Sequence, residues 1–286
     1  GPPGTQSRPD LAEGGPMARS ARDLELLLKV IAGPRPAEER SWALHMAPSV
    51  LQRLDQARVG YWLEDPLCPV EQELTEGYQA LGKSLAERGA LVTEVKHPLL
   101  SLEHILPAYF NLLGTLLSTS LKPAQRRQMK WIARLEPWLK FLGPMTPFIG
   151  EYGRGVNQPV YQWMAWNEMR EKMRAEIESL FQEVDVLLTP VTPTTAIRHD
   201  HSHPVFKRRI TVAGQPRAYM DQFCWIAFAT LLGLPATSVP IGRTQDGLPF
   251  NVQVIGAPGM DLTTIGFAGL LEEAGLAGFE RPTPLG

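Results

Sequence analysis

Three histidines alternate along one short stretch of the chain, a pattern typical of metal chemistry. His199, His201 and His203 occupy every second position, and Asp200 lies between the first two. Alternate side chains of an extended backbone share a face, so three imidazoles could converge on a zinc ion. The alternative is an exposed polar loop, and the basic residues 207–209 would weakly repel a cation. We expect the loop, and therefore neither a metal site nor a cofactor.

A group of aromatic side chains could line a binding pocket. Phe223, Trp225 and Phe228 lie close together in a stretch without charges. Ligand pockets are lined mostly by apolar side chains, although a place in the core is the alternative for these three. Thr192 follows a short apolar strand over residues 184–189, and ligands of open α/β sheets gather where strands end. We predict that these four residues contact the substrate; for Thr192 the alternative is a rigid turn.

Basic and aromatic residues are mixed over residues 122–142. Such a mixture can lie on a membrane surface, with its rings at the level of the headgroups and its cations near anionic lipid. The alternative is a solvated face with a buried aromatic edge. The residues concerned are Lys122, Arg126, Arg127, Lys130, Arg134 and Lys140, with Trp131, Trp138 and Phe141.

The composition excludes some classes of partner. The chain has 286 residues, of which 44% are hydrophobic and 20% are charged, and its formal net charge is -2. This balance is ordinary for a globular protein and lacks the basic excess of nucleic-acid-binding proteins. We therefore expect no nucleic acid as a partner. The length suffices for one large domain or two ordinary ones.

The cysteines and one uncharged stretch bear on the location of the protein. Cys68 and Cys224 lie far apart in the sequence and form no metal-type pair. No disulfide framework is expected, which favours a reducing cytoplasm. Residues 222–242 carry no charge and are long enough to span a membrane, but Pro235 and Pro240 interrupt a continuous helix. We expect a buried helix, a turn and a buried strand there.

The elements that must position these residues follow from hydrophobic periodicity. A strand, a helix and a second strand within residues 58–95 indicate a βαβ unit, and hence a mixed or parallel sheet covered by helices. Residues 102–150 are broken by prolines and predict short helices, and residues 190–217 predict a loop. Helices are expected over residues 20–31, 69–88, 158–183, 218–231 and 261–274, and strands over 58–63, 91–95, 184–189, 236–241 and 250–255.

Four segments, in this order, resemble the amidase-signature family. They are residues 15–23 (GPMARSARD), 184–193 (VDVLLTPVTP), 233–242 (GLPATSVPIG) and 247–256 (GLPFNVQVIG). Each motif alone has little specificity, but their order and spacing together are specific and extend over nearly the whole chain.

The resemblance implies a hydrolase that cleaves carboxamides with a Lys-Ser-Ser triad. One serine attacks the carbonyl, a deprotonated lysine acts as base through the bridging serine, and backbone amides of a Gly/Ser-rich loop hold the oxyanion. That machinery lies in the family's N-terminal half, and this sequence has no Ser-Ser pair, Gly-rich serine loop or Gly-x-Ser-x-Gly elbow. We assign no catalytic residue and expect the chain to be inactive alone. Arg19 and Asp23, an expected cap and ion pair, could instead support the absent loop.

Departures from the family pattern bear on the substrate. Members often carry Asn three residues before the glycine of the Gly-Leu-Pro segment, where this sequence has Thr230. Glutamine-specific relatives hold the substrate's amino group with an acidic residue, and Phe223 stands at the corresponding place. With Trp225 and Phe228 close by, the resemblance implies an apolar or aromatic amide.

These observations lead to one interpretation and two alternatives. We expect an α/β fold, the C-terminal half of the amidase-signature fold, with a mixed β-sheet covered by helices and a single domain over residues 1–286. The first residue is Gly1 rather than Met, which favours a fragment, a processed chain or a tag scar. The alternatives are a non-catalytic truncated paralogue that binds a partner or ligand, and a metal-binding protein. A homodimer and contact with a membrane surface stay open.

Overall fold

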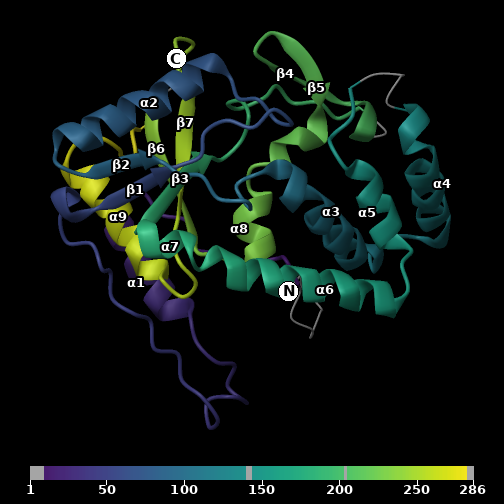
Figure 1. The fold of residues 1–286 in the computed structure, drawn as a ribbon, viewed down its shortest axis with the longest axis horizontal. Coiled ribbons are helices and arrows are strands. Elements are labelled where there is room, and N and C mark those ends of the chain that lie inside the picture. Colours follow the sequence, from purple (N-terminus) through teal and green to yellow (C-terminus); the bar gives the residue numbers. More distant parts are fainter. Residues whose placement is uncertain (1–9, 140–143, 203–204, 282–286) are drawn as a thin grey trace.

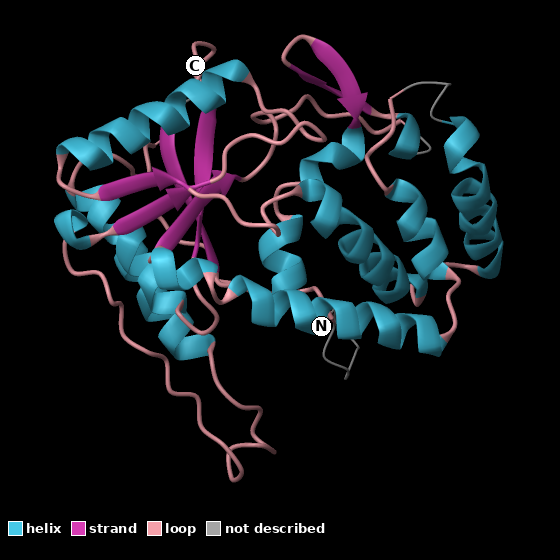
Figure 2. Ribbon diagram, viewed as in Figure 1, coloured by secondary structure: helices cyan, strands magenta, loops and turns pink. Residues whose placement is uncertain are grey.

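A mixed sheet and a group of helices make up the protein (Figures 1 and 2). The structure is a computed structural model that describes residues 10–139, 144–202 and 205–281. The sheet lies at one end, the helices α3 to α6 lie at the other, and α8 lies between them. The loop after residue 31 extends away from the body before the chain returns to the sheet.

The sheet has five strands in the described part of the chain, in the order β2-β1-β3-β7-β6. Strand β1 runs parallel to β2 and β3, whereas β7 is antiparallel to both β3 and β6. The predicted mixed sheet and βαβ unit are therefore confirmed. The strands are β1 (Arg58–Tyr61), β2 (Leu91–Glu94), β3 (Val186–Pro190), β6 (Ala236–Arg243) and β7 (Pro249–Ile255).

One face of the sheet is covered by α1 (Ala21–Ile31), α2 (Gln72–Glu87) and α9 (Asp261–Glu273). Side chains alternate along β3, and Val186 and Leu188 pack with these helices in one buried cluster. Helix α1 begins as predicted, because the side chain of Ser20 accepts a hydrogen bond from the Asp23 amide.

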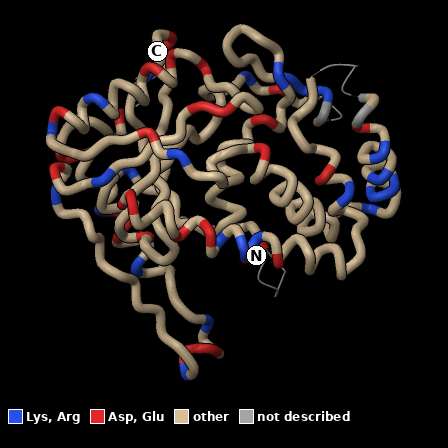
Figure 3. The backbone as a smooth tube through the Cα atoms, viewed as in Figure 1, with Lys and Arg blue, Asp and Glu red and all other residues tan. Residues whose placement is uncertain are grey.

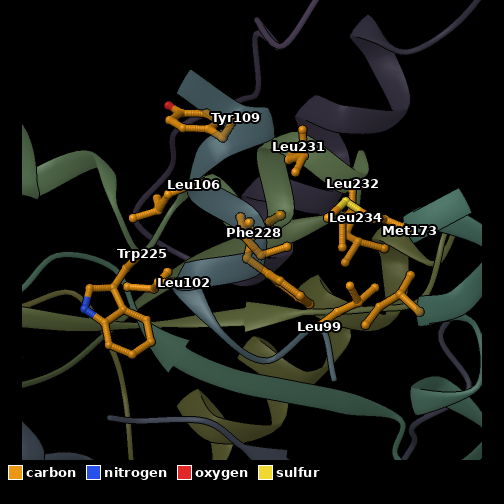
Figure 4. Close-up of a cluster of buried hydrophobic side chains, with 14 of the residues drawn as sticks. Leu99, Leu102, Leu106, Tyr109, Met173, Trp225, Phe228, Leu231, Leu232 and Leu234 are labelled. Atoms are coloured by element: carbon orange, nitrogen blue, oxygen red, sulfur yellow. The ribbon is translucent and has the colours of Figure 1, made fainter. Parts of the chain in front are cut away.

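The other face belongs to a second cluster (Figure 4). Leu187 of β3 and Ile255 of β7 are register partners and both point into it. The cluster also takes buried side chains from α3 (Leu102–Ser118), α6 (Val160–Ile177) and α8 (Ala227–Leu232). Successive side chains of β3 therefore enter the two clusters in turn, as expected for a strand that is buried on both faces of the sheet.

Two predictions about local structure were wrong. The described part of residues 102–150 consists mainly of two helices of 17 residues each, not several short pieces, and α3 continues through Pro107; a shorter helix begins at Ile149. The expected loop before residue 217 contains a hairpin of β4 (Arg209–Val212) and β5 (Gln215–Ala218). The remaining helices are α4 (Pro123–Leu139), α5 (Ile149–Val156) and α7 (Leu180–Glu183), and residues 219–223 form the 3-10 turn η4 (Tyr219–Phe223).

Candidate functional site

Three of the four motif segments line a single groove along strand β6. The groove has a volume of about 750 Å³. Its walls come from Ala18 to Leu24, from Thr237 to Arg243, from Pro249 and Asn251, and from the chain at the end of α9. The groove forms because α1 packs on α9, which itself covers β6 and β7. Segments more than 200 residues apart therefore meet at one site.

The charged side chains of the groove already have partners within the groove. The carboxylate of Glu272 accepts from the backbone amide of Ala21, at 3.0 and 3.1 Å to its two oxygens. This places a negative charge at the first turn of α1, where unpaired amides favour it. Arg243 pairs with Glu280 at 2.7 Å. The guanidinium of Arg19 stacks on Phe279, 5.0 Å from the ring centroid, rather than pairing with Asp23 as expected.

Ser238 supplies an exposed hydroxyl to the groove. Its oxygen accepts a hydrogen bond of 2.9 Å from the side-chain amide of Asn251. An amide is not a base, so it cannot take the hydroxyl proton that a nucleophilic serine must lose. Within the described ranges no hydrogen bond joins any serine to a lysine.

On the outer edge of β6, only some of the backbone N–H and C=O groups have hydrogen-bond partners. The Pro240 carbonyl accepts a bond of 3.1 Å from the Gly278 amide on the side of the strand away from β7. Backbone groups alternate in direction along a strand, so the N–H and C=O of Ser238 point the same way, into the groove. Proline has no N–H, so Pro240 adds no donor to this edge.

A second hollow, of about 460 Å³, lies where β1 and β2 end. It is lined in part by His97, whose Nε2 lies 3.2 Å from the Ser179 hydroxyl. The Leu99 amide donates to Nδ1 of the same ring at 3.2 Å. A neutral imidazole that accepts at Nδ1 carries its proton on Nε2, so it donates to Ser179 and cannot act as its base.

Thr192 lies in a turn after β3. Its hydroxyl donates to the Thr194 carbonyl at 2.6 Å and its side chain is half-buried. The neighbouring Thr189 is buried and accepts a bond of 2.9 Å from Gln253 on β7. These contacts are those of a rigid turn, and substrate contact by Thr192 stays a prediction.

The aromatic side chains divide into buried and exposed members. Trp225 and Phe228 are both fully buried, and each packs against Trp62, with ring centroids 5.1 and 5.6 Å apart. The Trp225 indole also donates to the Cys68 carbonyl at 3.1 Å. Phe223, at the end of η4, is 36% exposed. Of the three predicted pocket residues, Phe223 is the one that a ligand can touch directly in this arrangement.

A buried polar group beside these rings was not anticipated from the sequence. Asp221 is 1% exposed, and its Oδ2 accepts from the Nε of Arg217 at 2.7 Å, while its Oδ1 has no hydrogen-bond partner among the described residues. Arg217 also donates to the Leu67 carbonyl at 2.6 Å. The four-residue spacing of Arg217 and Asp221 was the one sequence feature that could have suggested the pair.

The two cysteines meet at the same place. Both are fully buried free thiols, and the Cys68 thiol donates to the Asp221 carbonyl oxygen at 3.6 Å. A hydrogen bond with Cys68, and then burial, raises the pKa of the Cys224 thiol well above its usual value. The sequence separation of these residues gave no hint of the contact.

The histidine cluster is only partly within the described residues. The rings of His199 and His201 lie 5.9 Å apart, and His203 falls outside the described ranges. Over residues 10–139, 144–202 and 205–281, no group of three or more His, Cys, Asp or Glu side chains is arranged to hold a metal ion.

Comparisons with known proteins identify the family. The family model described as Amidase matches residues 3–265. A glutamyl-tRNA(Gln) amidotransferase subunit of Thermus thermophilus is 30% identical over 278 residues, which cover 91% of this chain and 55% of that protein. The Azotobacter vinelandii subunit of the same name is 26% identical, with 86% of this chain and 51% of the relative covered. The chain thus spans about half the length of these curated relatives.

Solved structures agree in fold. An inhibitor-bound structure, described as a vestigial protein complex that reveals the origins of an s-triazine catabolic enzyme, aligns with a TM-score of 0.65. Its sequence is 21% identical, and the alignment covers 93% of this chain and 54% of that one. The family match over most of the chain, together with the shared fold, shows that this chain belongs to the Amidase family, the amidase-signature hydrolases.

Proposed function

We propose that this chain is the C-terminal part of an amidase that hydrolyses a carboxamide C–N bond to an acid plus an amine or ammonia. The mechanism is that of a Ser-Ser-Lys triad, whose residues lie outside this chain. One observation carries the proposal: three family segments form one groove, yet none of the serines at the two hollows bonds to a group that can take its proton. Ser20 and Ser238 accept from amides, and the imidazole beside Ser179 donates to it. The chain then supplies sheet, helices and one wall of the substrate site, and it is inactive alone.

The substrate of this proposed amidase is apolar or aromatic. Phe223 is exposed at the place where glutamine-specific relatives carry an acid. The carboxylate two residues before it, that of Asp221, is buried and already bound to Arg217. A charged amino group would have to compete with that guanidinium, which disfavours an amino-acid amide. Trp225 and Phe228 are buried against Trp62, and Thr192 lies in the turn that follows β3.

The proposed setting is the cytoplasm, and the proposed partners are the amide substrate and a further protein chain. The amidotransferase relatives are named as subunits, which supports a protein partner for this chain, a second copy of itself included. In the part of the chain that the structure describes, no helix combines the length and the apolar composition needed to cross a bilayer.

A hydrolysis assay tests where the nucleophile lies. We expect the purified 286-residue chain to release no product from an aromatic anilide above the uncatalysed rate, and to resist labelling by a serine-directed fluorophosphonate. Ser238→Ala and Ser179→Ala variants are the controls, because these two serines line or border the hollows. Turnover that either variant abolishes would place the nucleophile in this chain and overturn the proposal.

The genomic sequence upstream of Gly1 separates the amidase from the non-catalytic paralogue. An open frame that encodes a lysine and a Ser-Ser-Gly-Gly loop would support the amidase. A stop codon followed by a ribosome-binding site directly before Gly1 would instead support a chain that binds a partner or ligand without chemistry.

A further inference from the structure

Helix α4 carries an exposed surface on which cations surround an apolar stripe. Trp131, Leu135 and Trp138 follow one another at spacings of four and three, which places them on one side of the helix. They are 61%, 46% and 72% exposed, so none of them is a core residue. We call them, with the exposed basic residues around them, the basic–aromatic face of α4. Those basic residues are Arg127, Lys130 and Arg134; Arg127 lies four residues before Trp131, and Arg134 lies four residues before Trp138.

The charges of this face all have one sign. Glu136 is the only acidic residue between positions 122 and 139, and it is 6% exposed. It points toward α5, where it pairs with Arg154 at 3.3 Å. Its negative charge therefore does not neutralise the outward side of the helix. The guanidinium of Arg134 lies 5.8 Å from the Trp131 ring centroid, so cation and ring are presented together.

The position of α4 leaves this face accessible. The helix lies at the end of the molecule opposite the sheet, and Figure 3 shows its Lys and Arg residues gathered at that outer end. Ala133 and Glu136 hold its inner side against glycines of α5. The Asn157 side chain donates to the Arg126 carbonyl at 3.0 Å, which brings the start of α6 beside the start of α4. Val160 and Tyr161 there are 72% and 69% exposed.

We propose that the basic–aromatic face of α4 binds the surface of an anionic lipid bilayer. The helix would lie parallel to the membrane, with its two tryptophans at the headgroup level and its cations against lipid phosphates. Charge complementarity selects this partner: three cations without an exposed acid match an anionic surface, and the stripe beside them matches the apolar layer beneath it. Nucleic acid would account for the cations but not for the large, exposed Trp-Leu-Trp stripe. The inference does not depend on the proposed amidase activity.

Vesicle co-sedimentation of the whole chain tests the cations. Each basic residue close to an anionic surface changes the partition coefficient about fivefold, so an Arg127→Gln/Lys130→Gln variant should bind up to about 30-fold more weakly. The probe is phosphatidylcholine vesicles with about a third phosphatidylglycerol, at low and raised salt, because salt screens the attraction. The matched control is Lys83→Gln/Arg88→Gln, which removes the same charges from exposed positions on α2 and at its C-cap, at the opposite end of the molecule.

A second pair of variants tests the rings. Trp131→Ala/Trp138→Ala should lose binding to anionic vesicles, whereas Trp42→Ala, an exposed tryptophan in the loop before β1, should not. All variants should keep the circular dichroism and the unfolding midpoint of the parent, because the changed side chains are exposed. Brominated lipid should quench tryptophan fluorescence in the parent and not in the double variant.

Specific outcomes would overturn the proposal. Equal binding to neutral and anionic vesicles, or no binding to either, would remove the electrostatic argument. Binding that survives both double variants would place the contact elsewhere. If the face pairs with a second copy, sedimentation velocity will show a concentration-dependent dimer that Trp131→Ala/Trp138→Ala abolishes, without vesicle binding. Salt-dependent binding to duplex DNA without vesicle binding would assign the face to nucleic acid instead.

Discussion

Gly114 of α3 and Gly155 of α5 allow two helix backbones to cross in contact. A Cβ on Gly114 would lie 2.1 Å from the Tyr152 carbonyl oxygen, and one on Gly155 would lie 1.9 Å from the Asn111 carbonyl oxygen. Both obstacles are backbone atoms, which no side-chain rotation can move. We predict that Gly114→Ala destabilises the protein because α5 must move away from α3.

Two losses and one gain determine how much Gly114→Ala changes the free energy of unfolding. Overpacking of a tight contact costs about 1–3 kcal/mol, and here the helices must separate by roughly 1 Å. The separation also weakens the 3.1 Å bond from Thr115 to the Gly155 carbonyl, for about 1 kcal/mol more. Alanine offsets up to about 1 kcal/mol through its better helix propensity. The net loss in unfolding free energy should be about 2 kcal/mol.

Gly82→Ala is the matched control, because Gly82 also lies inside a helix. A Cβ there would lie 3.7 Å from a Val92 methyl group, which is ordinary contact. This variant should stabilise the protein by about 0.5–1 kcal/mol, so two identical chemical changes should differ by about 3 kcal/mol. Urea unfolding followed by circular dichroism measures both. If Gly114→Ala matched or exceeded the parent in stability, the close crossing of α3 and α5 would be wrong.

Three further predictions concern buried charge, pH and metal. Arg217→Met should lower the free energy of unfolding, measured in urea, by about 3 kcal/mol, because it leaves the Asp221 carboxylate buried and unpaired. Adding Asp221→Asn should recover most of that loss, whereas losses that add in the double variant would contradict the prediction. Burial, and then the nearby Cys224, raises the pKa of Tyr109 from 10.0 to about 12, so its stabilising contribution is complete below pH 10 and is lost as the pH rises through 12. Between pH 10 and 12 the parent should lose about 2–3 kcal/mol more stability than Tyr109→Phe, because the raised pKa values of Tyr78 and Cys224 affect both curves; parallel pH curves would refute it. Zinc calorimetry should give the same result for the parent and for His201→Ala, whereas a weaker affinity in the variant would support a metal site.

The parts of the fold that the sequence predicted are those in which periodicity reports burial directly. Helix α2 is the clearest case, since it lies within the predicted range 69–88. Leu74, Tyr78, Leu81 and Leu85 follow one another at helical spacings of four, three and four, and all four are buried. The mixed sheet followed from the short spacing of its strands, which requires a βαβ unit. The spacing of apolar residues within one helix or strand can be read from the sequence without knowing which elements pack against it.

Helix α3 shows where local rules fail. Pro107 should end or kink a helix, at a cost of about 3 kcal/mol. However, nine residues of α3 are buried, and Asp65 from the loop after β1 accepts the Leu102 amide at the helix start, at 2.9 Å. Burial of several large side chains exceeds the cost of one proline, at about 1.5–3 kcal/mol for each. Neither the burial nor the distant cap can be read from a local window.

The hairpin β4–β5 was missed for a different reason. Its strands have only four residues each, too few for alternation to indicate a strand, and Pro216 within the second strand argues against one. The turn is made by Ala213 and Gly214, which have φ of 49° and 71°. Two residues with positive φ are what a tight hairpin turn requires, but only the glycine indicates it in the sequence.

The candidate site depended on contacts between segments, which a sequence pattern cannot supply. The motifs indicated the family, but not that three of them would line one groove. That convergence depends on β6 standing last in the sheet order and on α1 packing on α9. The same arrangement turns the backbone groups of Ser238 into the groove, next to Pro240, whose carbonyl is already bonded to Gly278. A further strand that pairs with the outer edge of β6 can therefore bond to the N–H and C=O of Ser238. Its pairing must end before Pro240, because Pro240 has no N–H and its carbonyl already accepts from Gly278.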